Sequence, residues 1–237
     1  MFILECGKNH LGKRQEAKKI LNFFLKSSIN NLSFMCQSQK WYYKKLSKGK
    51  NFKLDKNFYI RALDSAHRRG KKIGLSVCDL KSLKDLGKIN FDFYKLLSVA
   101  ISDKNLCNYL IKKNKPIYIS TGFNASIKKI TKCMSYFKNF KKKILLHTPM
   151  VNKYNQLKFN KIDFLGKKFN VPVGYSNHFH DISTLLALSA YKPKVIMIYV
   201  KPSKKLNFIY PDDRHAIYLN EVEIIKQKYE NISKSHR

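Results

Sequence analysis

The sequence predicts an α/β protein that folds as a single-domain (β/α)8 TIM barrel. Eight short apolar segments alternate along the chain with eight segments of helical periodicity. The apolar segments are rich in β-branched residues, as strands are when both faces of a parallel sheet are buried. Eight such units in 237 residues match the size of a closed barrel. The alternative is a doubly wound open sheet, but no Gly-rich dinucleotide-binding turn supports it.

Each expected strand is a short apolar run that ends where polar residues begin. The seventh opens with Val171, Pro172 and Val173, and a proline is tolerated among the first residues of a strand. Gly174 in this strand would let a neighbouring group approach the backbone closely. The eight expected strands span residues 2–6, 32–36, 72–77, 91–97, 116–120, 144–147, 171–175 and 194–200.

The segments between these strands repeat apolar residues three and four positions apart, which predicts helices. Asp55 and Asp181 stand where N-terminal caps are expected, and Gly70 and Gly87 stand where helices should end. The expected helices span residues 14–25, 56–69, 80–86, 103–113, 125–137, 159–168, 182–191 and 219–229.

Two stretches are expected to lie outside this regular pattern. Residues 37–54 are basic and polar and are predicted to form an extended loop. Residues 230–237 are predicted to form a polar C-terminal tail. The barrel is therefore expected to occupy residues 1–229.

The charge of the chain is extreme, with 48 basic residues against 15 acidic ones and a formal net charge of +33. One interpretation is a protein that binds nucleic acid or an anionic membrane. The other is codon drift, because the abundant residues Lys, Asn, Ile, Phe and Tyr all have A/T-rich codons. The lysines are scattered rather than clustered, so drift is favoured and nucleic acid is not an expected partner. A positive field would still attract a phosphorylated substrate.

The cysteines and the apolar runs indicate the cellular compartment of the protein. Five cysteines, at positions 6, 36, 78, 107 and 133, form no CxxC pair and show no regular spacing. This pattern predicts buried, reduced thiols in a cytoplasmic protein. No apolar run approaches the length of a membrane span, and the first residues do not resemble a signal peptide.

The active site of such a barrel lies at the carboxyl ends of its strands. Lys95 interrupts an apolar strand there, so it either snorkels to solvent or binds an anion. His178 either belongs to a polar loop or binds a metal or shuttles a proton. The strand ends collect these polar residues: Glu5, Ser76, Lys95, Ser98, Ser120, Thr121, His147, Ser176, His178, Tyr199 and Lys201.

Six short motifs occur near strand ends in one order along nearly the whole chain. They lie at residues 4–12 (Leu-Glu-Cys-Gly-Lys-Asn-His-Leu-Gly), 95–98 (Lys-Leu-Leu-Ser), 116–122 (Pro-Ile-Tyr-Ile-Ser-Thr-Gly), 145–147 (Leu-Leu-His), 174–178 (Gly-Tyr-Ser-Asn-His) and 210–212 (Tyr-Pro-Asp). With these motifs the chain resembles the barrel domain of the sialic acid (N-acetylneuraminate) synthase family. The antifreeze-like domain that follows the barrel in that family has no counterpart in this sequence, so a barrel without it is expected.

The resemblance implies a transferase of surface carbohydrate biosynthesis. Members of the family condense phosphoenolpyruvate with an N-acetylated amino sugar to form a nonulosonic acid. A divalent metal, manganese or magnesium, polarises the sugar aldehyde as a Lewis acid. The resemblance is also compatible with a homodimer.

Matched position by position, the resemblance assigns roles to the strand-end residues. Glu5 and Asp212 match the catalytic, sugar-side carboxylates, and His178 matches one metal ligand, with Tyr199 at the place of the second. Lysine and hydroxyl groups suit phosphate and carboxylate oxygens, and a histidine suits a borderline divalent metal. The positions matched to substrate binding, mainly of phosphoenolpyruvate, are Ser76, Lys95, Ser98, Ser120, Thr121, His147 and Ser176.

The chain departs from the family at several positions. The second metal histidine is Tyr199 here, and the strand-two lysine that grips phosphoenolpyruvate is Met35. The aspartate before the strand-seven histidine is Asn177, and Thr148-Pro149 stands where a Tyr-Pro segment is usual. Two hypotheses therefore stand: an active synthase, and a degenerate barrel homologue that binds sugar or a partner without catalysis.

Other residues are candidates to compensate for these losses. Tyr199, His147 or a water would take the place of the lost metal ligand. Lys8 or Lys201 would take the place of the lost lysine. His10 and His180 are expected to be ordinary polar loop residues.

Overall fold

The computed structural model describes residues 1–37, 52–122, 125–202 and 209–235. Residues 38–51 of the predicted loop lie outside the described part of the chain.

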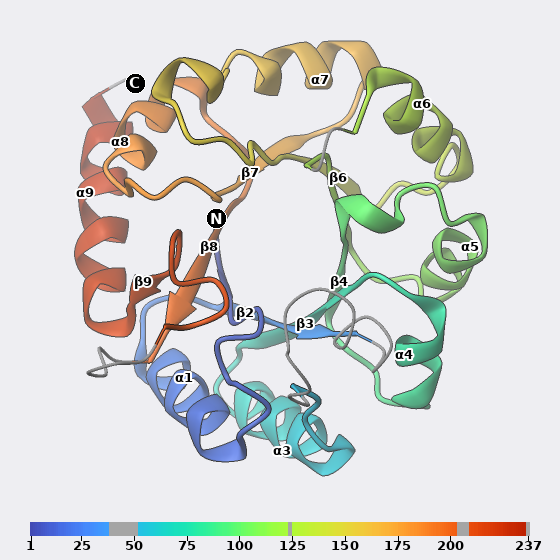
Figure 1. Ribbon diagram of the computed structural model, residues 1–237, viewed down its shortest axis with the longest axis vertical. Helices are drawn as coiled ribbons and strands as arrows, with labels where there is room; N and C mark the ends of the chain where they lie inside the picture. Colours follow the sequence, from blue (N-terminus) through green and yellow to red (C-terminus); the bar gives the residue numbers. More distant parts are fainter. Residues whose placement is uncertain (38–51, 123–124, 203–208, 236–237) are drawn as a thin grey trace.

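Eight parallel strands close into a barrel, which confirms the predicted (β/α)8 architecture (Figure 1). Strands that follow one another in sequence pair with one another, and β1 also pairs with β8 to complete the ring. The strands are β1 (Phe2–Glu5), β2 (Asn31–Cys36), β3 (Lys72–Val77), β4 (Phe93–Leu96), β5 (Ile117–Ser120), β6 (Lys143–His147), β7 (Val173–Ser176) and β8 (Ile196–Lys201).

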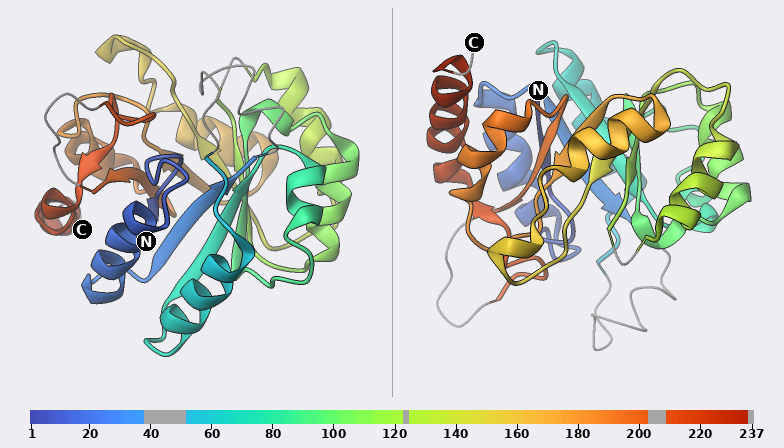
Figure 2. Two further views of the ribbon diagram at one scale, coloured as in Figure 1. Left: turned by 60° about the horizontal axis from the view of Figure 1, so that its bottom comes forward. Right: turned by 90° about the horizontal axis from the view of Figure 1, so that it is seen from above.

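Helices alternate with the strands and form the outer layer of the barrel, as the side views show (Figure 2). Asp55 caps its helix as predicted, because its carboxylate accepts a hydrogen bond of 2.8 Å from the backbone N–H of Phe58. The helices are α1 (Arg14–Lys26), α3 (Lys56–His67), α4 (Leu80–Asp85), α5 (Lys104–Lys112), α6 (Ile127–Tyr136), α7 (Lys161–Phe169), α8 (Thr184–Leu188) and α9 (Val222–Ser235).

Some boundaries differ from the sequence prediction. β4 begins at Phe93 rather than at residue 91, and α8 is short because its last turn is a 3₁₀ helix (Ser189–Tyr191). The prediction that Asp181 caps this helix is wrong, because the helix begins at Thr184 with Ser183 at its cap position, and the Asp181 carboxylate instead accepts a hydrogen bond of 2.9 Å from the N–H of Ser183. One additional strand of two residues was not foreseen: β9 (Ile217–Tyr218) pairs with the end of β8. α9 extends to Ser235, so most of the predicted tail is helical.

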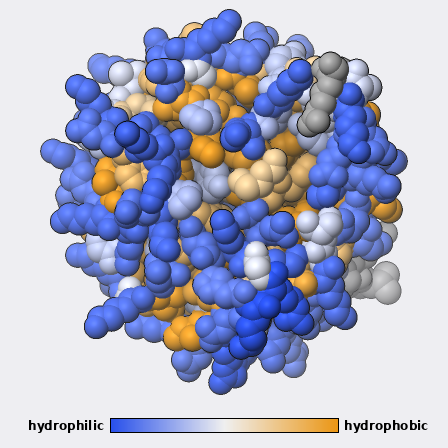
Figure 3. All heavy atoms as spheres, turned by 180° about the vertical axis from the view of Figure 1, so that it is seen from behind, coloured by the Kyte–Doolittle hydropathy of each residue, from blue (hydrophilic) through white to orange (hydrophobic). Residues whose placement is uncertain are grey.

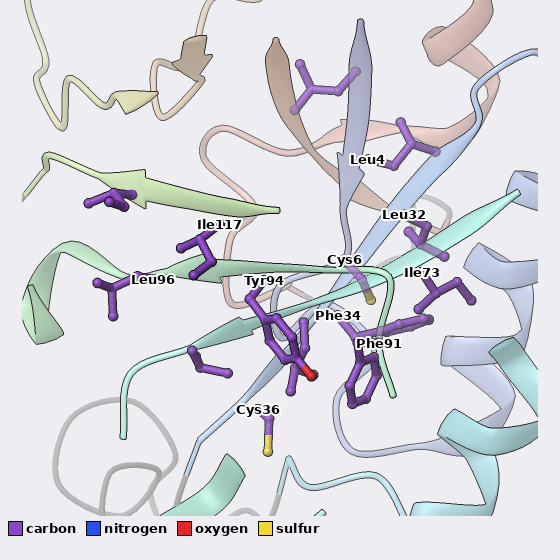
Figure 4. Close-up of a cluster of buried hydrophobic side chains, with 14 of the residues drawn as sticks. Leu4, Cys6, Leu32, Phe34, Cys36, Ile73, Phe91, Tyr94, Leu96 and Ile117 are labelled. Carbon is purple, nitrogen blue, oxygen red and sulfur yellow. The ribbon is translucent and has the colours of Figure 1, made fainter. Parts of the chain in front are cut away.

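Strand alternation sorts the side chains into an outer and an inner set. The outer set faces the helices and includes the apolar cluster in Figure 4, among them Leu4, Phe34, Ile73 and Tyr94. Burial of this apolar surface between sheet and helices is the main favourable term in folding such a barrel. Sequence periodicity therefore predicted the layer of apolar side chains between the strands and the helices.

The inner set changes from apolar to polar along the strands. A small apolar cluster that includes Ile3, Phe93 and Met197 fills the barrel interior. Side chains two residues further on share the same face, and here they are Glu5, Lys95 and Tyr199. All three of these polar residues are at most 2% exposed. The barrel is thus a packed core that ends in a buried polar layer at the carboxyl ends of the strands.

Gly174 keeps β7 and β8 close together, as its position suggested. A Cβ atom at this residue would lie 2.6 Å from the carbonyl oxygen of Val195, nearer than any real contact. No substitution of this glycine is compatible with the observed approach of the two strands. The next inward residue on β7 is Ser176, which contributes to the polar layer.

The outer surface is mainly hydrophilic, as one face viewed along the barrel shows (Figure 3). Chain ends pack together, since the ring of Tyr229 on α9 meets the ring of Phe2 edge to face at 5.3 Å. All five cysteines are buried and unpaired, as predicted. Across the described residues, the helices are too short or too polar to cross a membrane.

Candidate active site

A cavity of about 190 Å³ opens where the strands end. Six of the residues singled out in the sequence line it: Lys95, Ser98, Ser120, His178, Tyr199 and Asp212. They come from four strand ends and from the segment between β8 and β9. The carboxyl ends of a barrel's strands converge on one point, so residues far apart in sequence meet here.

Lys95 is the central charged group of the cavity wall. Its side chain is fully buried, and its ammonium donates to Ser176 Oγ at 3.2 Å and to the Tyr199 hydroxyl at 3.5 Å. The snorkelling interpretation is therefore wrong, because a snorkelling lysine keeps its ammonium in solvent. Burial lowers the pKa of Lys95, while the carboxylates of Glu5 and Asp212 oppose this shift.

Glu5 balances this charge from within the polar layer. One of its oxygens lies 3.7 Å from Lys95 Nζ and also accepts from Ser76 Oγ. The other accepts from the backbone N–H of Gly7 at 3.1 Å. Burial raises the pKa of Glu5, and the Lys95 ammonium opposes that shift. Glu5, Ser76 and Ser176 are fully buried and are not among the residues that line the cavity, and Glu5 and Ser176 contact the Lys95 ammonium.

Asp212 is held against the loop that follows β1. Its carboxylate accepts from the backbone N–H of Lys8 at 3.2 Å, and its own N–H donates to Asn9 Oδ1 at 3.0 Å. Gly7 makes this approach possible, because it has a φ of +52° and a Cβ there would collide with Asp212 and lie 2.9 Å from Tyr199 Cε1. The sugar-side carboxylate expected from the resemblance is thus fixed at the cavity rim.

Two imidazole rings stack over one wall of the cavity. The centroids of His178 and His215 lie 4.6 Å apart, and the rings are tilted by 38°. Each ring has a buried nitrogen without a hydrogen-bond partner among the described residues: Nδ1 of His178 and Nε2 of His215. Burial lowers the pKa of both histidines, most strongly that of His178, and so favours the neutral form of both rings. Neutral imidazole is the form that coordinates metals.

These side chains fit a divalent metal. Two neutral imidazoles with free nitrogens are borderline donors of the kind that manganese, iron or zinc accepts. Within the described ranges, no three His, Cys, Asp or Glu side chains gather closely enough to hold a metal by themselves. Further ligands would have to be oxygens of other groups, water or substrate, as in open catalytic sites.

Tyr199 stands where the resemblance implies a second metal histidine. Its ring packs against both imidazoles, with centroids 4.9 Å from His178 and 4.6 Å from His215. Its hydroxyl accepts a hydrogen bond from Lys95. Burial, with the nearby carboxylates of Glu5 and Asp212, raises its pKa well above the ordinary value. The phenolate that would bind a metal is therefore costly to form.

Two other predicted residues lie beside this cavity rather than in it. Thr121 and His147 line a neighbouring cavity of about 560 Å³ between α6 and α7. The Thr121 hydroxyl donates to the carbonyl of Leu146 at 2.9 Å, and His147 Nε2 donates to the carbonyl of Leu157 at 2.7 Å. Both polar groups are thus used within the protein.

The structure also shows the surroundings of the other positions at which the chain differs from the pattern that the resemblance implies. Met35 lines the main cavity at the position where the resemblance implies a lysine, and Lys8 also lines this cavity. Lys201 instead donates to the carbonyl and carboxylate of Asp213, at 3.0 and 2.9 Å. Lys8 is therefore the better placed of the two lysines considered as replacements. Asn177 is buried, and its amide donates to the carbonyl of Phe179 at 3.1 Å.

His215 is the functional candidate that sequence reasoning missed. It follows the quoted Tyr-Pro-Asp motif by three residues, so a signal existed in the sequence. A histidine in a loop gives no sign of facing a particular strand end, however. Only the folded segment between β8 and β9 brings it over His178.

The fold and this polar cavity define a class of (β/α)8 barrel with its site at the strand ends. The chain belongs to the NeuB family, whose family model matches residues 14–236. This confirms the family resemblance seen in the motifs.

Several relatives and solved structures are similar. The N,N'-diacetyllegionaminic acid synthase of Campylobacter jejuni is 25% identical over 99% of this chain and 77% of its own length. An uncharacterized protein of Methanocaldococcus jannaschii is 27% identical over 75% of this chain, and the match spans only 55% of that relative.

Among solved structures, a sialic acid synthetase of Leptospira borgpetersenii, in complex with citrate, has a TM-score of 0.88 at 21% identity. That match covers 99% of this chain and 84% of the other. The spore coat polysaccharide biosynthesis protein SpsE of Bacillus subtilis has a TM-score of 0.83 at 19% identity, over 99% of this chain and 68% of the other. At these identities the structures show a shared fold.

Proposed function

We propose that the chain condenses phosphoenolpyruvate with an N-acetylated amino sugar to form a nonulosonic acid, as a cytoplasmic enzyme of surface carbohydrate biosynthesis. One observation carries the proposal. A buried lysine, hydroxyl groups and two imidazoles converge on one cavity at the strand ends of a NeuB-family barrel. These are the groups that a phosphorylated carboxylate and a metal-bound aldehyde require.

The roles of the residues follow from their places around the cavity. Lys95 binds the anionic phosphoenolpyruvate, and Ser98 and Ser120 supply hydroxyls from neighbouring strand ends. Glu5 and Ser176 hold the Lys95 ammonium in place. Asp212, at the rim, orients the hydroxyl groups of the sugar. A divalent metal held at His178 would polarise the sugar aldehyde as a Lewis acid.

A second candidate function has its own support. Met35 and Tyr199 stand where the resemblance implies a lysine and a histidine, and the Tyr199 hydroxyl is engaged by Lys95. A barrel that binds a sugar acid or a partner subunit without turnover fits these losses. Phosphoenolpyruvate binding without phosphate release would favour this function.

The assay is phosphate release from phosphoenolpyruvate in the presence of manganese and N-acetylmannosamine or a related amino sugar. We expect sugar-dependent release, and a loss of about 100-fold or more in Lys95→Met, because one preorganised charge is removed. Lys201→Met is the matched control, since this lysine is also buried at a strand end but pairs with Asp213. No release with any amino sugar would overturn the proposal.

A further inference from the structure

The segment between β8 and β9 supplies a second imidazole to the cavity. His215 and His178 lie on different strand connections, yet their ring centroids are 4.6 Å apart and both rings line the same cavity. His178 follows β7, whereas His215 lies just before β9. The family resemblance instead implies a second histidine on β8, where this chain has Tyr199.

Both rings carry an unsatisfied polar atom. Nδ1 of His178 and Nε2 of His215 are buried and have no partner in the described part of the chain. A buried polar group left without a partner is destabilising, so two of them on neighbouring rings call for an explanation. A cation that accepts both lone pairs supplies one.

Tyr199 is a poor ligand for such a cation. Its hydroxyl already accepts from the Lys95 ammonium at 3.5 Å, and that ammonium lies 5.1 Å from the centre of its ring. A metal at this hydroxyl would lie beside the positive charge of Lys95. The ring instead supports the two imidazoles by edge contacts at 4.9 and 4.6 Å.

The segment that carries His215 is fixed in place by several contacts. The backbone N–H of His215 donates to the carbonyl of Asp212 at 3.2 Å, and Asp212 is bound in turn to the backbone of Lys8. Asn9 accepts from the Asp212 N–H and donates to the carbonyl of Val200, which joins the loop after β1 to β8. β9 then pairs with the end of β8. A fixed ligand loses less entropy on coordination.

We infer that His178 and His215 together hold the divalent cation, and that His215 replaces the histidine lost from β8. The ligand set is two imidazole nitrogens, completed by oxygens of water or substrate. Asp212 places a negative charge in the same segment. The inference deepens the proposed function and rests on it for the choice of manganese, but cation binding itself needs no substrate.

The test is calorimetric titration of the full, metal-free chain with manganese chloride alone. We expect one site, weakened at least 10-fold in His178→Gln and equally in His215→Gln. Tyr199→Phe keeps the ring and removes only the hydroxyl, so its affinity should stay within about threefold. His180→Gln is the matched control, because this exposed histidine lies two residues from His178 outside the cavity.

A spectroscopic measurement on the unsubstituted chain makes the test independent of folding of the variants. Pulsed paramagnetic resonance of the bound manganese should detect two imidazole nitrogens, and one in each histidine variant. A single nitrogen in the unsubstituted chain, or unchanged affinity in His215→Gln, would overturn the inference. If manganese binds with two nitrogens but no sugar releases phosphate, the site stands and the proposed function falls.

Discussion

Lys95 and His147 show how far the role of a single residue depends on what surrounds it. Both stand at strand ends and both were expected to meet substrate. The Lys95 ammonium reaches the cavity wall among Ser176, Tyr199 and Glu5. His147 turns to the other face of its strand, where its ring lies 5.9 Å from that of Tyr175 and its nitrogen is bound to Leu157. Successive side chains of a strand point to opposite faces, so two residues at strand ends can lie in different surroundings.

His147 makes stability depend on pH. Burial lowers its pKa to about 4, against an ordinary value of about 6.5 in the unfolded chain. The folded state therefore binds fewer protons between these values, so stability is complete above pH 6.5 and falls as the pH drops toward 4. This group therefore lowers the free energy of unfolding by about 3 kcal/mol over this pH range. His10, whose pKa burial lowers to about 3, adds a loss of the same sign.

Urea unfolding at pH 7 and pH 4.5 measures this effect through His147→Gln. Glutamine keeps an N–H donor for the Leu157 carbonyl but has no proton to gain. We expect the slope of unfolding free energy against pH to decrease by as much as about 1.4 kcal/mol per pH unit. The exposed His180→Gln should retain the original slope. An unchanged slope in His147→Gln would contradict the assignment of the low pKa to this residue.

At the scale of elements, the loop after β1 and the segment before β9 form one unit. Neither contains much regular structure, and they are about 200 positions apart in sequence, as the separation of Lys8 and Asp212 shows. Backbone-to-side-chain hydrogen bonds join them through Asp212 and Asn9. The short strand β9 anchors the second segment on β8. This unit carries Lys8, Asp212 and His215 to the cavity.

Gly7→Ala should disrupt this unit. An alanine at a φ of +52° costs about 1 to 2 kcal/mol in backbone strain, and its Cβ would also collide with Asp212. Gly87→Ala is the matched control, because Gly87 has a φ of +67° but nothing within 4 Å of a Cβ. Denaturant unfolding should show a lower free energy of unfolding in both variants, with a decrease that is larger by about 1 to 3 kcal/mol in Gly7→Ala. Equal losses would mean that Asp212 moves aside without cost.

At the scale of the whole molecule, the net charge of +33 is spread over a single barrel. Two carboxylates lie close to buried lysines at the strand ends: Glu5 lies 3.7 Å from Lys95 Nζ in the polar layer, and Asp212, which lines the cavity, accepts from the backbone N–H of Lys8. The surface lysines therefore set the long-range field. Such a field raises the local concentration of anions and is screened by salt.

If the proposed function holds, salt should consequently affect the two proposed substrates differently. Raising sodium chloride from about 20 to 300 mM shortens the Debye length to below 10 Å. We expect the KM for phosphoenolpyruvate to rise several-fold, because this substrate is anionic. The KM for the neutral amino sugar should change by less than about twofold. Equal responses of both KM values would show that the field does not select the anion.

The sequence by itself determined the barrel and its family. Apolar runs alternating with helical periodicity fix a parallel sheet covered by helices, because every strand must bury both faces. The strand-end motifs are short local patterns of sequence, so they can be recognised without knowledge of the structure. The element boundaries predicted at residues 91, 182 and 230 differ from those in the structure, because caps and 3₁₀ turns depend on neighbours in space.

Only the tertiary structure decided which polar residues share the cavity. A one-residue step along a strand reverses the direction of a side chain, which sent Thr121 and His147 to the neighbouring cavity. Burial in the polar layer lowers the pKa of Lys95 and raises the pKa of Glu5, and the pairing of the two groups opposes both shifts. His215 has no periodicity to place it, and it meets His178 only in the folded chain, where the hydrogen bonds of Asp212 and the pairing of β9 with β8 hold the residues around it in place. Long-range contacts of this kind depend on the complete fold rather than on any local stretch of sequence.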